Sequence, residues 1–235
     1  LEWIPNVSAE ERSSYESVAK SEGFKNFKFT ERSGKGKLIK ADTREDFFPV
    51  FYLEPMKGNE SVFGFDLGSS VDRRIALEAA RDSGRIVTSE SIALVQNGRA
   101  GVLLFAPIYE PGWPIHSIEL RRDNITGFAL GAIDIQQMIS AAFISHDKLA
   151  TPDGIDFYIF DNDKIIDDPL IYLHQSRKRT ASPAPKLNLA DSQSTLHVTN
   201  KIEIGDRKWL LVARPIEPNF GATVPFSAWG VLLLG

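Results

Sequence analysis

The stretch that decides the fold is Gly-Val-Leu-Leu-Phe-Ala-Pro-Ile-Tyr, residues 101–109. It is an almost continuous apolar run of the length of one β-strand, and similar runs occur at residues 86–94 and 127–133. Polar, glycine-containing segments separate the three runs, as expected of strands joined by turns. Because helical patterns precede and follow these strands, their order predicts an α+β fold built on an antiparallel sheet.

Helical patterns lie ahead of these strands. Ser8-Ala9-Glu10-Glu11 has the sequence of a capping box, Val7 stands where a hydrophobic staple would, and apolar residues follow at helical spacing until Gly23. We therefore assign residues 1–23 to an N-terminal helix. Residues 70–83 predict a second helix that ends at Gly84, and its buried face is expected to consist of Ile75, Ala76, Ala79 and Ala80.

Between the two helices lies Phe47-Phe48-Pro49-Val50-Phe51-Tyr52-Leu53. This segment lacks the alternation of apolar and polar residues that marks a strand with one wet face. It predicts a segment that is buried on both sides.

The second half of the chain partly repeats this pattern. Residues 135–149 predict a connecting helix, residues 155–160 a strand, and residues 196–204 and 208–213 a hairpin across Gly205-Asp206. We expect a larger unit of residues 24–134 and a smaller one within residues 135–220, each a sheet with flanking helices. A chain of 235 residues is long enough for both.

The C-terminal residues are apolar from Val224 onward, and no charged residue follows Glu217. They are too few to cross a bilayer, which requires about 20 apolar residues. We interpret residues 221–235 as the start of a truncated transmembrane helix, with Trp229 at the level of the lipid headgroups. A C-terminal strand or helix of the core is the alternative.

The composition excludes several classes of protein. The 27 basic and 31 acidic side chains give a net charge of −4, whereas nucleic-acid-binding domains carry a basic excess. Cysteine is absent, the four histidines lie far apart, and no nucleophile-elbow or phosphate-loop motif occurs. We therefore expect no catalytic residues, no metal site and no cofactor. A cysteine-free chain fits a bacterial extracytoplasmic compartment.

Asp66 is the polar residue whose position indicates a site. It follows the apolar Val62-Phe63-Gly64-Phe65 and precedes a helix, so its carboxylate needs hydrogen-bond donors. The donors are either backbone N–H groups of the following turn, which would make Asp66 an N-cap, or a bound ligand. Thr88-Ser89-Glu90-Ser91 likewise interrupts an apolar strand, either as a β-bulge with local hydroxyl bonds or as the few polar groups of a small-molecule pocket.

Blocks of sequence in a fixed order over residues 1–135 resemble the CHASE domain, the extracellular sensory module of receptor histidine kinases and nucleotide cyclases. The blocks include EWIPNV (2–7), FFPVFYLEP (47–55), GFDL (64–67), LVQ (94–96) and PIY (107–109). The resemblance extends to the sensor domains of plant cytokinin receptors. It implies a long N-terminal helix and two tandem PAS-like antiparallel-sheet units, a membrane-distal one that binds ligand and a membrane-proximal one that leads into a transmembrane helix.

The resemblance also implies the ligand-binding residues. In the plant receptors an aspartate holds the adenine of the hormone, and Asp66 stands at the matching position. Thr88 matches a position that contributes backbone groups. The complete set of candidate ligand-binding residues is Asp66, Thr88, Phe51, Phe65, Gly101, Leu103 and Phe105. Leu67-Gly68-Ser69 departs from the plant pattern, which has bulkier methionines there, so the expected ligand is a small organic molecule that need not be a cytokinin.

The sequence thus predicts an extracytoplasmic, periplasmic sensor domain of an inner-membrane or plasma-membrane receptor. It would bind a small ligand, act as a homodimer, and signal through flanking transmembrane helices to a cytoplasmic histidine kinase, diguanylate cyclase or phosphodiesterase. Two alternatives stay open. One is a protein-interaction or structural ectodomain without a small ligand, and the other is a membrane-anchored hydrolase or lyase, which requires titratable residues that converge in a cleft.

Overall fold

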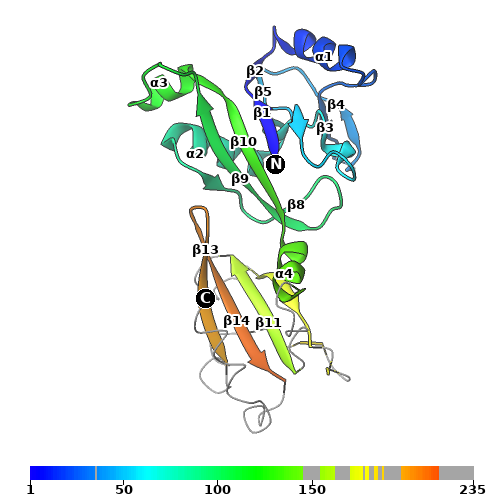
Figure 1. The fold of residues 1–235 in the computed structure, drawn as a ribbon, viewed down its shortest axis with the longest axis vertical. Coiled ribbons are helices and arrows are strands. Elements are labelled where there is room, and N and C mark those ends of the chain that lie inside the picture. The colour runs from blue at the N-terminus through cyan, green and yellow to red at the C-terminus, as the bar shows by residue number, and fades with distance from the viewer. Residues whose placement is uncertain are drawn as a thin grey trace. The chain divides into compact units, whose positions relative to one another are not determined.

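The computed structural model describes residues 1–34, 36–144, 154–161, 170–176, 178–179, 183–184, 187 and 197–216 (Figure 1). The chain divides into two compact units, Leu1–Gln137 and Met138–Gly235.

An antiparallel sheet forms the centre of the first unit, with strands in the order β6-β1-β10-β9-β7 and β8 beside β9. The strands are β1 (Glu2–Pro5), β6 (Tyr52–Leu53), β7 (Val87–Thr88), β8 (Ile92–Ala93), β9 (Ala100–Tyr109) and β10 (Ile125–Asp134). The two longest, β9 and β10, pair in a register that places Phe105 opposite Leu130. The antiparallel α+β fold predicted from residues 101–109 and 127–133 is confirmed.

The predicted strand over residues 86–94 is divided into β7 and β8, which both pair with β9. Between them, Ser89 bonds Leu103 twice: the Ser89 N–H donates to the Leu103 carbonyl at 2.8 Å, and the Ser89 hydroxyl oxygen accepts from the Leu103 N–H at 3.0 Å. A side-chain hydroxyl thus replaces a backbone carbonyl in the ladder. The polar segment that follows Thr88 therefore interrupts the strand through local hydroxyl bonding.

The N-terminal helix is shorter than predicted. Residues 2–5 form β1, residues 7–8 form β2 (Val7–Ser8), and α1 spans only Arg12–Ser21. The capping box does form, because Glu11 Oε2 accepts from the Ser8 N–H at 3.1 Å and from the Ser8 hydroxyl at 2.8 Å, but it closes a turn ahead of the helix. A helix over residues 1–23 is wrong because β1 buries Ile4 in the sheet, and this burial outweighs the local helical pattern.

Helix α2 (Val71–Ser83) ends as predicted at Gly84, which has φ 70° and donates its N–H to the Ala80 carbonyl at 2.9 Å. Its buried face differs from the predicted one. Ile75 was expected in the core and is 63 % exposed, whereas Leu77 is fully buried. Ala76 and Ala80 are buried as predicted, but Ala79 is exposed, so burial of the larger Leu77 side chain sets the rotation of the helix.

Shorter elements complete the first unit. They are β3 (Thr30–Arg32), β4 (Leu38–Lys40), β5 (Asp46–Phe47), the 3-10 turns η1 (Glu60–Val62) and η2 (Leu67–Ser69), and α3 (Ile118–Asp123). β2 pairs with β5, and β3 pairs with β4.

The apolar segment of residues 47–53 is buried from Phe47 to Phe51, as predicted, but only its two ends are strands. Pro49 has no N–H group with which to continue a ladder. The residues after it bond separate partners instead: the Val50 N–H donates to the Phe65 carbonyl at 3.0 Å, and the Phe51 N–H donates to the Trp3 carbonyl at 3.0 Å.

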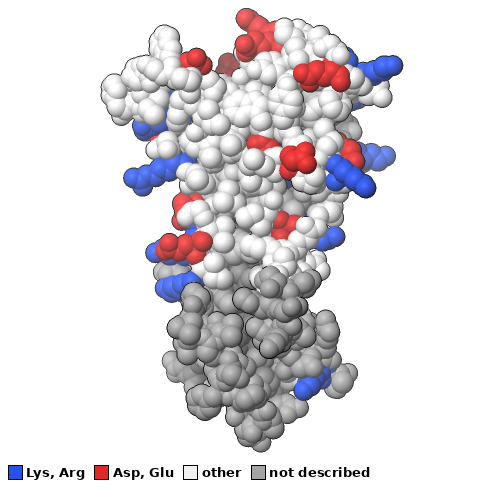
Figure 2. Space-filling model, in the orientation of Figure 1, with Lys and Arg blue, Asp and Glu red and all other residues white. Residues whose placement is uncertain are grey.

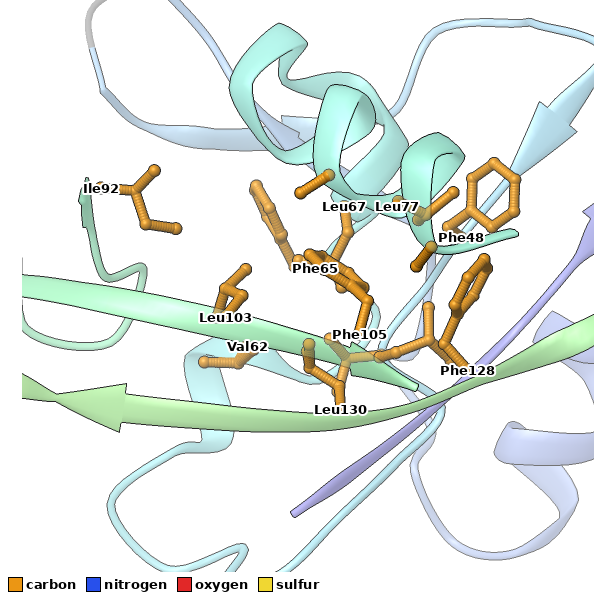
Figure 3. Packing of buried hydrophobic residues seen from close by; sticks show 14 of the residues in the cluster. Phe48, Val62, Phe65, Leu67, Leu77, Ile92, Leu103, Phe105, Phe128 and Leu130 are labelled. Atoms are coloured by element: carbon orange, nitrogen blue, oxygen red, sulfur yellow. The ribbon is translucent and has the colours of Figure 1, made fainter. Parts of the chain in front are cut away.

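Two hydrophobic clusters cover opposite faces of the sheet, because successive residues of β1 point to different clusters: Ile4 belongs to one and Trp3 packs against the other. The larger cluster fills the space between the strands and α2. Figure 3 shows Leu103 and Phe105 of β9 there, with Leu77 of α2 above them. The smaller one, which includes residues of α1, consists of Val7, Ala19, Phe27, Phe29, Ala41, Phe47 and Phe51.

The second unit contains a four-stranded antiparallel sheet in the order β12-β11-β14-β13. The strands are β11 (Ile155–Asp161), β12 (Leu170–His174), β13 (Val198–Ile204) and β14 (Arg207–Pro215). β11 and the β13–β14 hairpin agree with the predicted strand and hairpin, apart from residue 196, which lies outside the described residues.

The predicted connecting helix begins where α4 (Ile135–Ile144) begins, and its remaining residues, 145–149, lie outside the described part of the chain. The predicted start of a transmembrane helix, residues 221–235, also lies outside it. Among the helices that the structure describes, none combines the length and the hydropathy needed to cross a bilayer.

Candidate functional site

Asp66 lies at the junction of three segments of the first unit, and its side chain is fully buried. Its Oδ1 atom accepts from the Phe48 N–H at 2.8 Å and from the Gly68 N–H at 3.0 Å. Its own N–H donates to the Thr30 carbonyl at 2.8 Å. Asp66 is therefore the N-cap of η2, and the capping interpretation of this residue is confirmed.

Arg44 supplies the charge that balances Asp66. Its guanidinium donates to Asp66 Oδ2 and also to a carboxylate oxygen of Glu31. The Arg44 side chain is 22 % exposed, so the guanidinium forms the rim of the site while the aspartate lies beneath it. The Phe47 ring lies below the same guanidinium, at 5.6 Å from its carbon to the ring centroid.

Burial dominates the protonation of this carboxylate. The pKa of Asp66 is raised above its ordinary value because desolvation disfavours the charged form more than the Phe48 N–H, the positive charge of Arg44 and the Gly68 N–H favour it. An additional donor at Asp66 would therefore stabilise its ionised form.

Gly68 is required by the close packing around this carboxylate. A Cβ atom there would lie 2.8 Å from Cδ2 of Phe48 and 3.2 Å from Oδ1 of Asp66. The glycine that departs from the plant receptor pattern thus lets the Phe48 ring cover the aspartate.

The other predicted ligand-binding residues divide between two places. Phe65, Leu103 and Phe105 belong to the larger cluster, between the sheet and α2, and each is less than 5 % exposed. Thr88 is also buried and pairs with Leu104 of β9. Phe51 belongs to the smaller cluster on the opposite face.

The space beside Gly101, where a side chain would lie, is occupied by atoms from outside β9. A Cβ atom at this position would lie 2.6 Å from the Leu94 side chain and 2.6 Å from the Ile133 carbonyl oxygen. Leu94 therefore occupies the space that the missing side chain leaves, and it belongs to the same cluster as Phe65, Leu103 and Phe105, which Figure 3 shows packed together.

Sequence reasoning missed Arg44 and Glu31. Arg44 stands 22 positions before its partner Asp66, and Glu31 stands 13 positions before Arg44. The one local signal is that Arg44 directly precedes the acidic pair ahead of the buried segment at residues 47–53, where a charged side chain has to reach a partner.

A groove with a volume of about 460 Å³ opens at the edge of the sheet where β1 and β6 pair. Of the candidate residues only Phe51 lines it. Its lining residues are Leu1, Glu2, Trp3, Phe24, Phe51, Tyr52, Leu53, Glu54, Met56, Phe63 and Ala129. The pKa of Glu2 is raised to about 7, because burial outweighs the opposing effect of the positive amino group of Leu1.

An apolar groove with a few polar groups at its wall is the kind of cavity in which small molecules bind. In the part of the chain that the structure describes, no group of three or more His, Cys, Asp or Glu side chains is placed to hold a metal ion. The family model of the CHASE domain matches residues 1–172. The chain therefore belongs to the CHASE domain family, as the sequence blocks predicted, and CHASE domains are extracellular sensory domains of membrane receptors.

One curated relative is "Hybrid signal transduction histidine kinase A" of Dictyostelium discoideum, which is 29 % identical over 229 residues. The match covers 91 % of this chain and 10 % of the relative, so the chain spans about a tenth of that protein. A solved structure, "Extracellular ligand binding receptor from Desulfohalobium retbaense DSM5692", has a TM-score of 0.44 at 12 % identity and covers 70 % of this chain and 28 % of that one. The assignment to the CHASE family rests on the family match alone and not on this structure.

Proposed function

We propose that this chain is the ligand-sensing part of a membrane receptor, and that a small organic molecule binds in its first unit. The sensory domain itself is non-catalytic, and the catalytic output would be a cytoplasmic histidine kinase, diguanylate cyclase or phosphodiesterase. The observation that carries the proposal is the position of Asp66: a fully buried carboxylate at the place where the CHASE resemblance puts a ligand contact.

The ligand would reach Asp66 by taking the place of Arg44. Oδ1 of Asp66 is committed to two backbone N–H groups, whereas Oδ2 is held by the partly exposed guanidinium. A ligand with an N–H donor edge, such as an adenine-like ring, would replace that guanidinium at Oδ2. Arg44 would keep Glu31 as its partner when it leaves, so the exchange replaces one charge-assisted hydrogen bond by another.

The apolar part of the ligand would enter the layer of Phe65, Leu103 and Phe105, beside Thr88 and Gly101. These side chains are packed against each other, so binding requires the layer to open. A ligand moves such an equilibrium only by its different affinity for the closed and open states. We infer that opening of this layer is the conformational signal.

The signal would pass through the second unit to a membrane helix that begins within residues 221–235. In this proposal both units are PAS-like, the receptor is a homodimer in the inner or plasma membrane, and the ligand binds on its extracytoplasmic side. The support within the described residues is a feature that the two larger sheets share: the first strand of each sheet along the chain lies between the second and the last strand of that sheet, β1 between β6 and β10, and β11 between β12 and β14.

Thermal unfolding of the chain in the presence of adenine derivatives, amino acids and carboxylates tests the proposal, with Asp66→Asn as the informative variant. Asp156→Asn is the matched control, because Asp156 is an equally buried aspartate that pairs with Arg179 in the second unit. A ligand that raises the melting temperature of the wild-type chain and of the Asp156 variant, but not of the Asp66 variant, is the expected result.

The second candidate function is a structural or protein-binding ectodomain. The complete pairing of the Asp66 carboxylate within the chain favours it, since a capping residue needs no ligand. In that case no compound stabilises the wild-type chain. Each aspartate variant then lowers the stability by the same amount with a compound present as without one. This outcome would remove the ligand-binding proposal.

A further inference from the structure

The groove at the β1–β6 edge has walls of an unusual composition. Two contacting pairs of aromatic rings line it, Phe24 with Phe63 at 4.6 Å and Phe51 with Tyr52 at 5.1 Å between centroids, together with Trp3. Five aromatic side chains therefore line one cavity. An aromatic ring attracts a cation that lies over its face, through the negative potential there.

The charged side chains that line the groove are both acidic. Glu2 lies on β1 and Glu54 directly follows β6, and none of the lining residues is a lysine or an arginine. The structure gives the carboxylate of Glu2 no ion pair within the described residues. Figure 2 shows acidic atoms set among uncharged ones on this face, close to the start of the chain.

One positive group lies at the groove, the amino group of Leu1. It donates to the Glu54 carbonyl at 2.8 Å, and the Glu54 N–H donates to the Leu1 carbonyl at 2.9 Å, so Leu1 is bonded as a strand residue. The charge of its amino group lowers the pKa of Glu2 by less than burial raises it, so this charge does not offset the burial of the carboxylate.

We propose that this groove binds a small organic cation, an ammonium group attached to an apolar body, with Glu2 as the counter-charge and the five aromatic rings as its walls. The volume of about 460 Å³ is in the range of small-molecule sites. The apolar body contacts Leu53, Met56 and Ala129, and the ammonium group lies between Glu2 and the ring faces. This site is separate from Asp66, so the two proposals stand or fall independently.

Burial explains why such a cation is selected. Glu2 is costly to ionise without a partner, which is why its pKa is raised to about 7. A bound cation replaces the water that the carboxylate lost and restores its charge. An anion or a neutral alcohol of the same shape gains nothing from Glu2, so the groove discriminates by charge.

The test is calorimetric titration of the chain, acetylated at Leu1, with three compounds that share one phenyl ring and one spacer: phenethylamine, phenethyl alcohol and hydrocinnamate. Acetylation removes the one positive charge of the wall and keeps an N–H for Glu54. We expect phenethylamine to bind at least about tenfold more tightly than the other two, as one cation–π contact and one ion pair require. Equal affinity for all three, or tighter binding of the anion, would overturn the proposal.

Two variants identify the groups responsible. Glu2→Gln should reduce the preference for phenethylamine by about tenfold, and Tyr52→Leu, at a ring that is 52 % exposed, should reduce it without unfolding the chain. Glu10→Gln, at an exposed acid outside the groove, is the matched control and should leave the preference unchanged. If Glu2→Gln and Glu10→Gln have the same effect, Glu2 is not the counter-charge and the proposal fails.

The pH dependence supplies a readout that a nonspecific apolar site would not show. Phenethylamine should bind more tightly above pH 7 than below it, because Glu2 is ionised there, and Glu2→Gln should abolish this difference. Asp66→Asn should change neither the affinity nor its pH dependence, which separates this site from the proposed ligand contact at Asp66.

Discussion

Both units of this chain bury one aspartate and pair it with one arginine, but they use the pair differently. In the first unit, Asp66 accepts from the Phe48 and Gly68 backbone N–H groups and from Arg44, which also binds Glu31. In the second unit, Asp156 on β11 accepts from the Ser176 N–H at 2.8 Å and from Arg179. Both aspartates are fully buried.

The difference lies in how many segments each aspartate joins. Asp66 connects η2, the segment around β5 that carries Arg44 and Phe48, and β3, whose Thr30 carbonyl accepts its N–H, whereas both partners of Asp156 come from the segment after β12. A residue that joins several distant segments stabilises the tertiary arrangement of its whole unit. One that fastens a single segment stabilises mainly that segment.

The largest expected effect follows from this contrast. Asp66→Ala leaves the buried N–H groups of Phe48 and Gly68 without their acceptor and leaves Arg44 with Glu31 alone, and it should destabilise the first unit by about 3–5 kcal/mol, as loss of one partner of a buried pair does. Asp156→Ala leaves one buried N–H group, that of Ser176, and Arg179 without their acceptor, and should cost about 1–3 kcal/mol.

Amide hydrogen exchange of each variant measures the effect on both units at once, because the Phe48 and Gly68 amides report on the first unit and the Ser176 amide on the second. Faster exchange throughout the first unit is expected for Asp66→Ala, and faster exchange confined to the neighbourhood of Ser176 for Asp156→Ala. If faster exchange extends over an equally large part of each unit in the two variants, the two aspartates have the same structural role.

The next effect concerns glycine, which occurs within the strands of the first unit and not within the described strands of the second. Gly101→Ala should destabilise the first unit by about 1–3 kcal/mol, because its Cβ would lie 2.6 Å from Leu94 and from the Ile133 carbonyl oxygen. Gly131→Ala, on the neighbouring strand, is the control: its nearest atom would be Leu104 Cβ at 3.9 Å.

Denaturant unfolding with an unchanged slope compares the two glycine variants. If Gly131→Ala costs as much as Gly101→Ala, then loss of the glycine backbone and not close packing by Leu94 accounts for the effect.

The sequence predicted the parts of the fold that depend on local pattern. The runs at residues 101–109 and 127–133 are the two strands with the longest pairing in the chain, joined by one connection, and their apolar character alone indicates a strand. Gly84 marked the end of α2 for a local reason too, since it adopts a positive φ that other residues disfavour.

What the sequence could not predict depends on distant partners. The helix expected over residues 1–23 gave way to β1 because Ile4 is buried against strands more than 100 positions later. Arg44 finds Asp66 only once the segments fold together, and the groove assembles Trp3, Phe24 and Phe63 from three separate segments. Phe51, the one candidate residue in that groove, was assigned to the same site as Phe65 but lies on the opposite face of the sheet.

A smaller effect concerns the groove in the first unit: the pH dependence of stability that Glu2 causes. Because the pKa of Glu2 rises from 4.5 to about 7 on folding, the native state binds its proton more tightly than the unfolded state does. The stability that this group contributes is complete below about pH 4.5 and is lost as the pH rises through 7. Asp66, whose pKa is also raised, changes stability in the same direction.

Unfolding free energies of the wild-type chain and of Glu2→Gln, measured across this pH range, isolate the contribution of Glu2. We expect the difference in stability between the variant and the wild type to grow in favour of the variant between pH 4.5 and 7, since glutamine pays no cost of ionisation. A difference that is constant over this range would show that Glu2 ionises normally in the folded chain.

The smallest effect concerns a surface pair. Arg122 of α3 binds Asp82 in the last turn of α2, and this hydrogen bond is the main reason why the pKa of Asp82 is lowered to about 2. The Arg122 side chain is 54 % exposed, so water and salt screen the interaction, and Arg122→Ala should lower the stability only slightly. Because the folded-state pKa is lowered, the contribution is present above the unfolded value of 3.8 and is lost as the pH falls toward 2.

The second unit provides the comparison for this pair, in Arg207, which binds Asp161 and has a side chain that is 28 % exposed. Less exposure means less screening, so Arg207→Ala should cost more than Arg122→Ala, and its cost should fall less when salt is added. Denaturant unfolding of both variants at low and high ionic strength measures the two costs. The reverse order would mean that exposure does not govern these pairs, and the same argument from exposure could then no longer rank Arg44 and Arg179 above Arg122.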